Sequence, residues 1–165
     1  MHRIYGVVPA TVESLEDDDE LGRVVLRYRW MSKKEPKTPP ARIATALAGG
    51  DRGLQFMPEA GDEVLVAFEQ GDPRVPYIVG FLWNGKQKPP RQKPEQRTLK
   101  TVSGHVLEFD DTKDKEKVSL LFKGGEPSIV LDAKKLSIKF SDTSYIELTS
   151  SELKIVNSTL VSINP

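Results

Sequence analysis

The sequence predicts an all-β protein, and two patterns carry this prediction. Short apolar runs with period-two alternation recur along the 165 residues, whereas the 3.6-residue period of an amphipathic helix is almost absent. Over residues 126–165 the alternation becomes nearly regular, because apolar pairs two residues apart recur between polar joints. A near-regular repeat of short strands is typical of a stacked or wound array.

The composition limits the possible functions. The chain has 24 basic and 24 acidic residues and a formal net charge of zero, which argues against a protein whose main task is to bind polyanions. It has no cysteine, so a disulfide framework and thiolate chemistry are excluded. No apolar run approaches the length of a membrane span, and the first residues do not resemble a signal peptide. We therefore expect synthesis in the cytosol, with export only as part of a larger machine.

Five strands are expected in the first half of the chain, separated by a proline-rich loop at 33–40 and a glycine-punctuated connection at 49–57. The expected strands are residues 4–15, 22–30, 41–46, 63–68 and 77–82. Strands of this number and size fit a small closed barrel of the OB type, with a sandwich as the alternative.

The expected domain boundaries are 1–86 for the barrel, 87–98 for a linker and 99–165 for the tail. Residues 85–95 are rich in proline and basic side chains, which indicates a stiff, extended linker whose charges are solvated.

The tail is expected to form a series of short strands with one apolar face. In the last forty residues the expected strands are 128–131, 136–140, 145–148, 153–155 and 160–163. The side chains of the apolar face would be Ile129, Leu131, Ile138, Phe140, Ile146, Leu148, Leu153, Ile155, Val161 and Ile163.

An ordinary antiparallel meander is the simplest interpretation of this tail. The lack of glycine after Gly125, and of Asn-Gly or Asp-Gly pairs, argues against tight hairpins, which favour positive φ. A one-layer sheet would also leave its apolar face in water, so another surface must cover it. The preceding domain could do so, but copies of the same tail would cover it at every level. We therefore favour a tail that associates with copies of itself.

No catalytic site, cofactor or metal site is expected. Ser103 and His105 share a strand face but lack a third partner, so a structural histidine is favoured over a nucleophile and base. Residues 110–114 have acidic spacing without the glycine and late glutamate of a calcium loop. Residues 49–53 lack the Gly-Lys-Ser/Thr of a phosphate loop, and the acidic run 16–20 is interpreted as a solvated loop.

Several longer runs resemble one protein family. They are residues 21–30, 41–44, 56–68, 71–85, 103–105 and 108–112. These runs are similar to the OB domain, and to the entry into the needle, of the central spike of contractile injection systems. This is the VgrG-like and phage baseplate assembly protein V family, which includes VgrG of type VI secretion and the spikes of extracellular contractile systems.

The resemblance implies an N-terminal OB-fold barrel followed by an intertwined trimeric β-helix or β-prism needle. It further implies a homotrimer mounted on a hub protein, a PAAR-type tip protein at the C-terminal end, and transient contact with a target membrane. The residues that would bind the tip are Leu160, Val161, Ile163, Asn164 and Pro165. The chain would be incorporated in the baseplate of a contractile particle, whether phage tail-like, extracellular or type VI-like.

Some family features are not matched. No hub-like segment precedes Met1, so the hub is expected to be a separate chain, and no lysozyme-like insertion separates barrel from needle. Iron-binding His-x-His pairs at the tip are also absent, since the only histidines are His2 and His105.

A monomeric OB-type module that binds oligonucleotide or oligosaccharide is the alternative function. Such a barrel needs a positive groove with stacking aromatic rings. Tyr28, Trp30, Arg27 and Arg29 form the one local cluster of this kind. The zero net charge argues against nucleic acid as the ligand.

Overall fold

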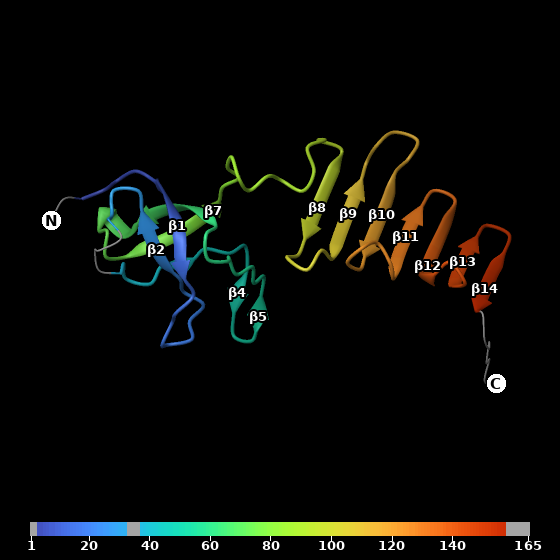
Figure 1. The fold of residues 1–165 in the computed structure, drawn as a ribbon, viewed down its shortest axis with the longest axis horizontal. Coiled ribbons are helices and arrows are strands. Elements are labelled where there is room, and N and C mark those ends of the chain that lie inside the picture. Colours follow the sequence, from blue (N-terminus) through green and yellow to red (C-terminus); the bar gives the residue numbers. More distant parts are fainter. Residues whose placement is uncertain (1–2, 33–36, 158–165) are drawn as a thin grey trace. The chain divides into compact units, whose positions relative to one another are not determined.

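The computed structural model describes residues 3–32 and 37–157, which fall into two compact units, Met1–Lys88 (unit 1) and Pro89–Pro165 (unit 2). Both units consist of β-strands (Figure 1), and the only helical element in the described part is the 3-10 turn η1 (Glu69–Gly71). The all-β prediction is therefore confirmed. The described residues contain no helix long and apolar enough to cross a membrane.

Unit 1 is built on a five-stranded sheet that closes on itself. Its strand order is β2 (Val25–Tyr28), β1 (Val8–Ser14), β6 (Glu63–Phe68), β7 (Pro76–Phe81) and β3 (Arg42–Ile43). Only β3 and β7 are parallel. Val24, next to β2, exchanges two backbone hydrogen bonds of 3.0 and 2.7 Å with Ala41, next to β3. This bridge joins the two ends of the sheet, which gives the small closed barrel of an OB fold.

Alternate residues of the barrel strands fill its core. In β6, Val64, Val66 and Phe68 are buried while the residues between them are half-buried, as the period-two pattern predicts. The remaining buried core residues are Ala10, Val12, Val24, Leu26, Tyr28, Ala41 and Ile78.

Three expected strands are shorter in the structure, and the first of them, expected over 4–15, is only Val8–Ser14. The strand expected over 22–30 ends at Tyr28, because the N–H of Met31 turns back to the carbonyl of Tyr28. Trp30 is therefore exposed, and its ring stacks on Tyr28 with centroids 4.8 Å apart. The strand expected over 41–46 is only β3, and a small hairpin of β4 (Ala48–Gly49) and β5 (Arg52–Gly53) follows it.

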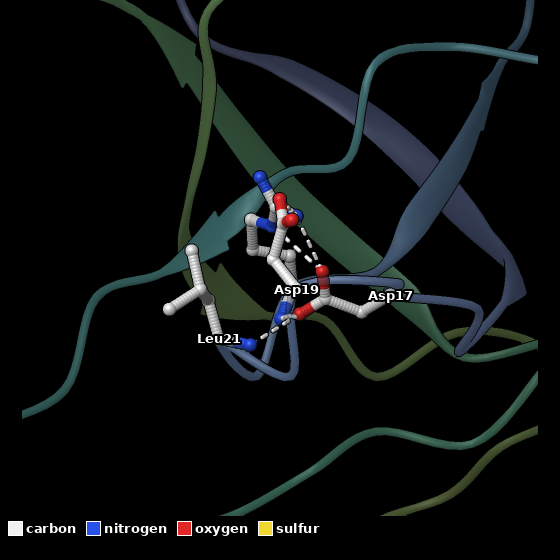
Figure 2. A network of polar contacts seen from close by, with 4 residues as sticks. Asp17, Asp19 and Leu21 are labelled. Carbon is white, nitrogen blue, oxygen red and sulfur yellow. Dashed lines mark hydrogen bonds and ion pairs between the residues drawn. The ribbon is translucent and has the colours of Figure 1, made fainter.

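The acidic run at 16–20 contains a structured turn rather than only solvated charges. Asp17 accepts hydrogen bonds from the backbone N–H groups of Leu21 (2.8 Å) and Arg23 (2.9 Å) and from the Arg23 guanidinium, which Asp19 also contacts. Figure 2 shows the Asp17 carboxylate bound to the backbone N–H of Leu21, with Asp19 close by. The hydrogen bonds from Arg23 lower the pKa of Asp17 to about 2, from an ordinary value of 3.8. Asp17 thus holds the backbone of the residues that lead into β2.

We predict that Asp17→Asn lowers the melting temperature of the protein by several degrees at neutral pH. Because the pKa of Asp17 is depressed in the folded state, its contribution is complete above about pH 4 and is lost as the pH falls towards 2. The difference between wild type and variant should therefore vanish near pH 2 in a series of melting curves. The matched control is Asp19→Asn, since the Asp19 side chain is 66% exposed and makes one contact with Arg23. An equal effect of the two substitutions would contradict this account.

Unit 2 is a single seven-stranded antiparallel sheet in which each strand pairs with the next along the chain (Figure 1). The strands are β8 (Gln96–Lys100), β9 (Val106–Asp110), β10 (Lys117–Leu121), β11 (Ser128–Asp132), β12 (Lys135–Ser141), β13 (Ser144–Thr149) and β14 (Leu153–Asn157). The strand expected over 160–163 lies outside the described residues. Strand β8 begins at Gln96, inside the stretch expected to be linker.

The tail forms tight hairpins, contrary to the prediction from its lack of glycine. The turn between β11 and β12 closes because Asp132 accepts hydrogen bonds from the N–H groups of Lys134 (2.7 Å) and Lys135 (3.0 Å). The turn between β13 and β14 closes similarly, with the Thr149 hydroxyl accepting from Glu152 at 3.0 Å and from Ser151. No residue of either turn has a positive φ. Side-chain acceptors of this kind form tight turns without glycine.

We predict that Thr149→Ala loosens the last hairpin, because the N–H groups of Ser151 and Glu152 lose their acceptor. The cost of a lost hydrogen bond is about 0.5–1.5 kcal/mol. Hydrogen exchange at these two amides should become faster, and Thr149→Ser should restore protection. Ser150→Ala is the control, and faster exchange in that variant as well would show that the hydroxyl of Thr149 is not responsible.

Candidate assembly interface

One face of the unit 2 sheet carries two rows of apolar side chains, which we call the apolar face. In the strand register, directly opposed residues form a first row that crosses all seven strands: Leu99, Leu107, Leu120, Ile129, Ile138, Ile146 and Ile155. The second row crosses β9 to β14: Phe109, Val118, Leu131, Leu136, Leu148 and Leu153. Opposed residues of antiparallel strands share a face with Cβ atoms about 5 Å apart. The apolar face is therefore continuous.

The apolar face is open to solvent in the single chain. The exposed fraction of the side chains in the two rows ranges from 37% for Leu107 to 61% for Leu153, apart from Leu136, which is half-buried. Phe140 lies where β12 bulges beside the first row and is 70% exposed. Soluble proteins rarely expose apolar surface on this scale unless it binds a partner. The apolar face is thus the strongest candidate for a functional surface.

The opposite face of the sheet carries the charged groups, several of which have partners, together with a few apolar residues: Val106, Leu121, Val130, Tyr145 and Val156. Lys135 pairs with Glu147, and Lys139 pairs with Glu126 at 2.6 Å. Asp110 is buried and accepts hydrogen bonds from the Thr112 hydroxyl at 2.6 Å and from Gln96. These bonds, led by that from Thr112, lower the pKa of Asp110 to about 2. Because removing such charges from water is costly, a partner should avoid this face.

Eight of the ten residues predicted from the sequence to form the core of the needle are described. Seven lie in the two rows, and Phe140 lies beside them. Val161 and Ile163, with the expected tip-binding residues Leu160, Asn164 and Pro165, lie outside the described residues. Sequence reasoning missed six members of the rows: Leu99, Leu107, Phe109, Val118, Leu120 and Leu136. The signal was present, since residues 99–121 carry the same period-two alternation.

The structure does not bring Ser103 and His105 together as a nucleophile and base. The Ser103 hydroxyl contacts the Thr101 hydroxyl at 3.2 Å, while the His105 ring packs against Phe122 with centroids 4.5 Å apart. Among the residues that the structure describes, no group of three or more histidine, aspartate or glutamate side chains could hold a metal ion.

The aromatic and arginine cluster of β2 does not form a positive groove. Arg27 pairs with Glu13 and Arg29 pairs with Glu63 at 2.8 Å, so each guanidinium has its own carboxylate. Tyr28 is buried, and burial raises its pKa to about 12. Trp30 is therefore the exposed aromatic ring of this cluster. These pairings weaken the alternative of an oligonucleotide-binding module.

Unit 1 has an open hollow of about 760 Å³ beside the β4–β5 hairpin. Exposed apolar side chains gather around it, among them Leu47, Leu54 and Phe56. Asp51 and Arg52 are the only charged residues in its lining.

Comparison with known proteins gives a family match for the barrel. Residues 8–83 match the family described as type VI secretion system/phage-baseplate injector OB domain. This range contains all five strands of the closed sheet.

Curated relatives match beyond the barrel. The actin cross-linking toxin VgrG1 of Vibrio cholerae is 31% identical over 133 residues, which cover 72% of this chain and 12% of the relative. The type VI secretion system spike protein VgrG1b of Pseudomonas aeruginosa is 27% identical over 71% of this chain and 16% of its own length. VgrG1a of the same organism is 34% identical over 48% of this chain and 13% of its own. The chain thus spans less than a sixth of each of these relatives.

Proposed function

Because this chain belongs to the VgrG-like spike family through its type VI secretion system/phage-baseplate injector OB domain, we propose that it forms the central spike of a contractile injection system. The proposal has two parts. The OB barrel attaches to a hub protein of the tail tube, and three copies of unit 2 form a needle. The role is structural and involves no catalysis, cofactor or nucleic acid.

The exposed apolar face is the observation that carries the needle. A strand of five residues, the commonest length in unit 2, is about 17 Å long. Three such sheets could form the sides of a triangular prism whose edges are about 17 Å long. In a triangle of this size each side lies about 5 Å from the centre, which is half of the ~10 Å between packed sheets. The apolar rows of three copies would then meet on the axis at normal packing distance. Strands about 4.8 Å apart would stack along that axis.

The remaining partners are proposed from the family. A PAAR-type tip protein would cover the C-terminal end through Leu160, Val161, Ile163, Asn164 and Pro165. The contraction stroke would drive the covered needle transiently through the target membrane. A needle whose strands are paired along its length resists local unfolding, which suits a part that carries load.

The decisive experiment is the molar mass of the purified chain by light scattering, together with two substitutions. The wild type should have the mass of a trimer. Ile146→Asp should abolish assembly, because it places three carboxylates near one axis and buried unpaired charges cost several kcal/mol each. Val130→Asp is the matched control, since it introduces the same charge on the polar face of a nearby strand.

This pair of variants distinguishes the assembly from a lone sheet. In the single chain Ile146 is 40% exposed while Val130 is less exposed, so without assembly Val130→Asp would be the more damaging change. The needle predicts the reverse order. A monomeric wild type, or greater damage from Val130→Asp, would refute it.

A further inference from the structure

Side chains hold the chain on both sides of the boundary between the two units. On the side of unit 1, Gln87 donates a hydrogen bond from its side-chain amide to Asp62 at 2.9 Å. The backbone of Gln87 also closes a small turn with Asn84, donating to its side chain at 2.9 Å and accepting from its N–H at 3.0 Å. Asp62 immediately precedes β6, so the barrel holds the chain at Gln87.

On the side of unit 2, Arg91 is bound to the first hairpin of the sheet. Its Nε donates to Glu108 at 2.7 Å, and Glu108 is only 5% exposed. The Thr98 hydroxyl donates to the same carboxylate at 3.1 Å. Further along, the carbonyl of Glu95 accepts from the N–H of Asp111 at 3.0 Å. The chain thus lies along this hairpin from Arg91 onward.

The pairing of Arg91 with Glu108 has a clear physical cause. A buried carboxylate without a counter-charge or hydrogen-bond donors is strongly unfavourable. Thr98 supplies one donor, and the guanidinium supplies both a donor and the opposite charge. The linker charges were expected to be solvated, but the Arg91 side chain, although 37% exposed, pairs with the buried carboxylate of Glu108.

We infer that the joint between the units is the three residues Lys88, Pro89 and Pro90, clamped by Gln87–Asp62 on one side and Arg91–Glu108 on the other. It replaces the twelve-residue linker expected from the sequence. Three extended residues span at most about 10 Å, and the two prolines fix φ near −65°. A joint this short leaves few rotatable backbone bonds between the two clamps. Both clamps lie within one chain, so the inference does not depend on threefold assembly.

Limited proteolysis of the full chain with trypsin tests both clamps. Proline follows Lys88 and Lys93, so the cleavable bonds of this segment are those after Lys86 and Arg91. Cleavage by a protease reports local opening. In the wild type both bonds should be cut slowly. Glu108→Gln should accelerate cleavage after Arg91 by about tenfold, and Gln87→Ala should do the same after Lys86.

The matched control is Asp111→Asn, which removes the carboxylate that pairs with the exposed Arg97 on the same hairpin. It should leave cleavage after Arg91 unchanged. If Glu108→Gln unfolds the hairpin, Arg91→Lys tests the same contact, since it keeps the charge and the cleavage site but loses the Nε donor. Cleavage after Arg91 should then rise without a change in circular dichroism.

Three results would overturn the inference. The first is wild-type cleavage after Arg91 as fast as in a free peptide of residues 85–95. The second is an unchanged rate in Glu108→Gln and Arg91→Lys. The third is equal acceleration by Asp111→Asn, which would indicate general loosening of the hairpin rather than loss of a clamp.

Discussion

The structure depends on one constraint: a sheet of one layer has two faces, and in unit 2 only the polar face is satisfied within the chain. The backbone ladder holds the seven strands in register, but it does nothing for the side chains that alternate above and below. On the polar face, ion pairs and hydrogen bonds provide partners for the charged groups. On the apolar face, the two rows remain in water. The hydrophobic effect therefore favours any arrangement that covers these rows.

The polar face determines how such an arrangement can form. Covering it would desolvate Lys135, Lys139 and Glu147, which gain little from an apolar neighbour. The Arg91–Glu108 clamp also lies on this face, because Glu108 is directly opposed to Ser119 and Thr98 on that side of the sheet. The chain that enters unit 2 thus runs over the polar face and leaves the apolar rows open. The proposed association and the chain connection would therefore use opposite sides of the same sheet.

The sequence predicts the parts of this fold that depend on local alternation. The strands between 128 and 155 and the apolar positions on them follow from period two, and so does the core of the barrel. Features that depend on a specific side-chain contact, local or distant, do not follow from this alternation. The turns at Asp132 and Thr149 close through side-chain acceptors, and Arg91 finds Glu108 seventeen positions along the chain. From the sequence alone, an arginine among prolines is expected to be solvated, because the burial of its partner Glu108 is not apparent there.

The narrowness of the apolar face favours three copies over two. Its rows stand two residues apart on each strand, which corresponds to a stripe about 7 Å wide. In two sheets packed face to face, the strand directions differ by about 30°. Over seven strands the two stripes would therefore diverge by about 8 Å at each end, and the apolar side chains of the first and last strands would be exposed again. Three sheets around a common axis avoid this divergence, because each sheet can twist about the axis and keep its stripe pointing inward at every level. A long, narrow stripe on a twisted sheet is therefore best covered by winding around an axis, which is the geometry proposed for the needle.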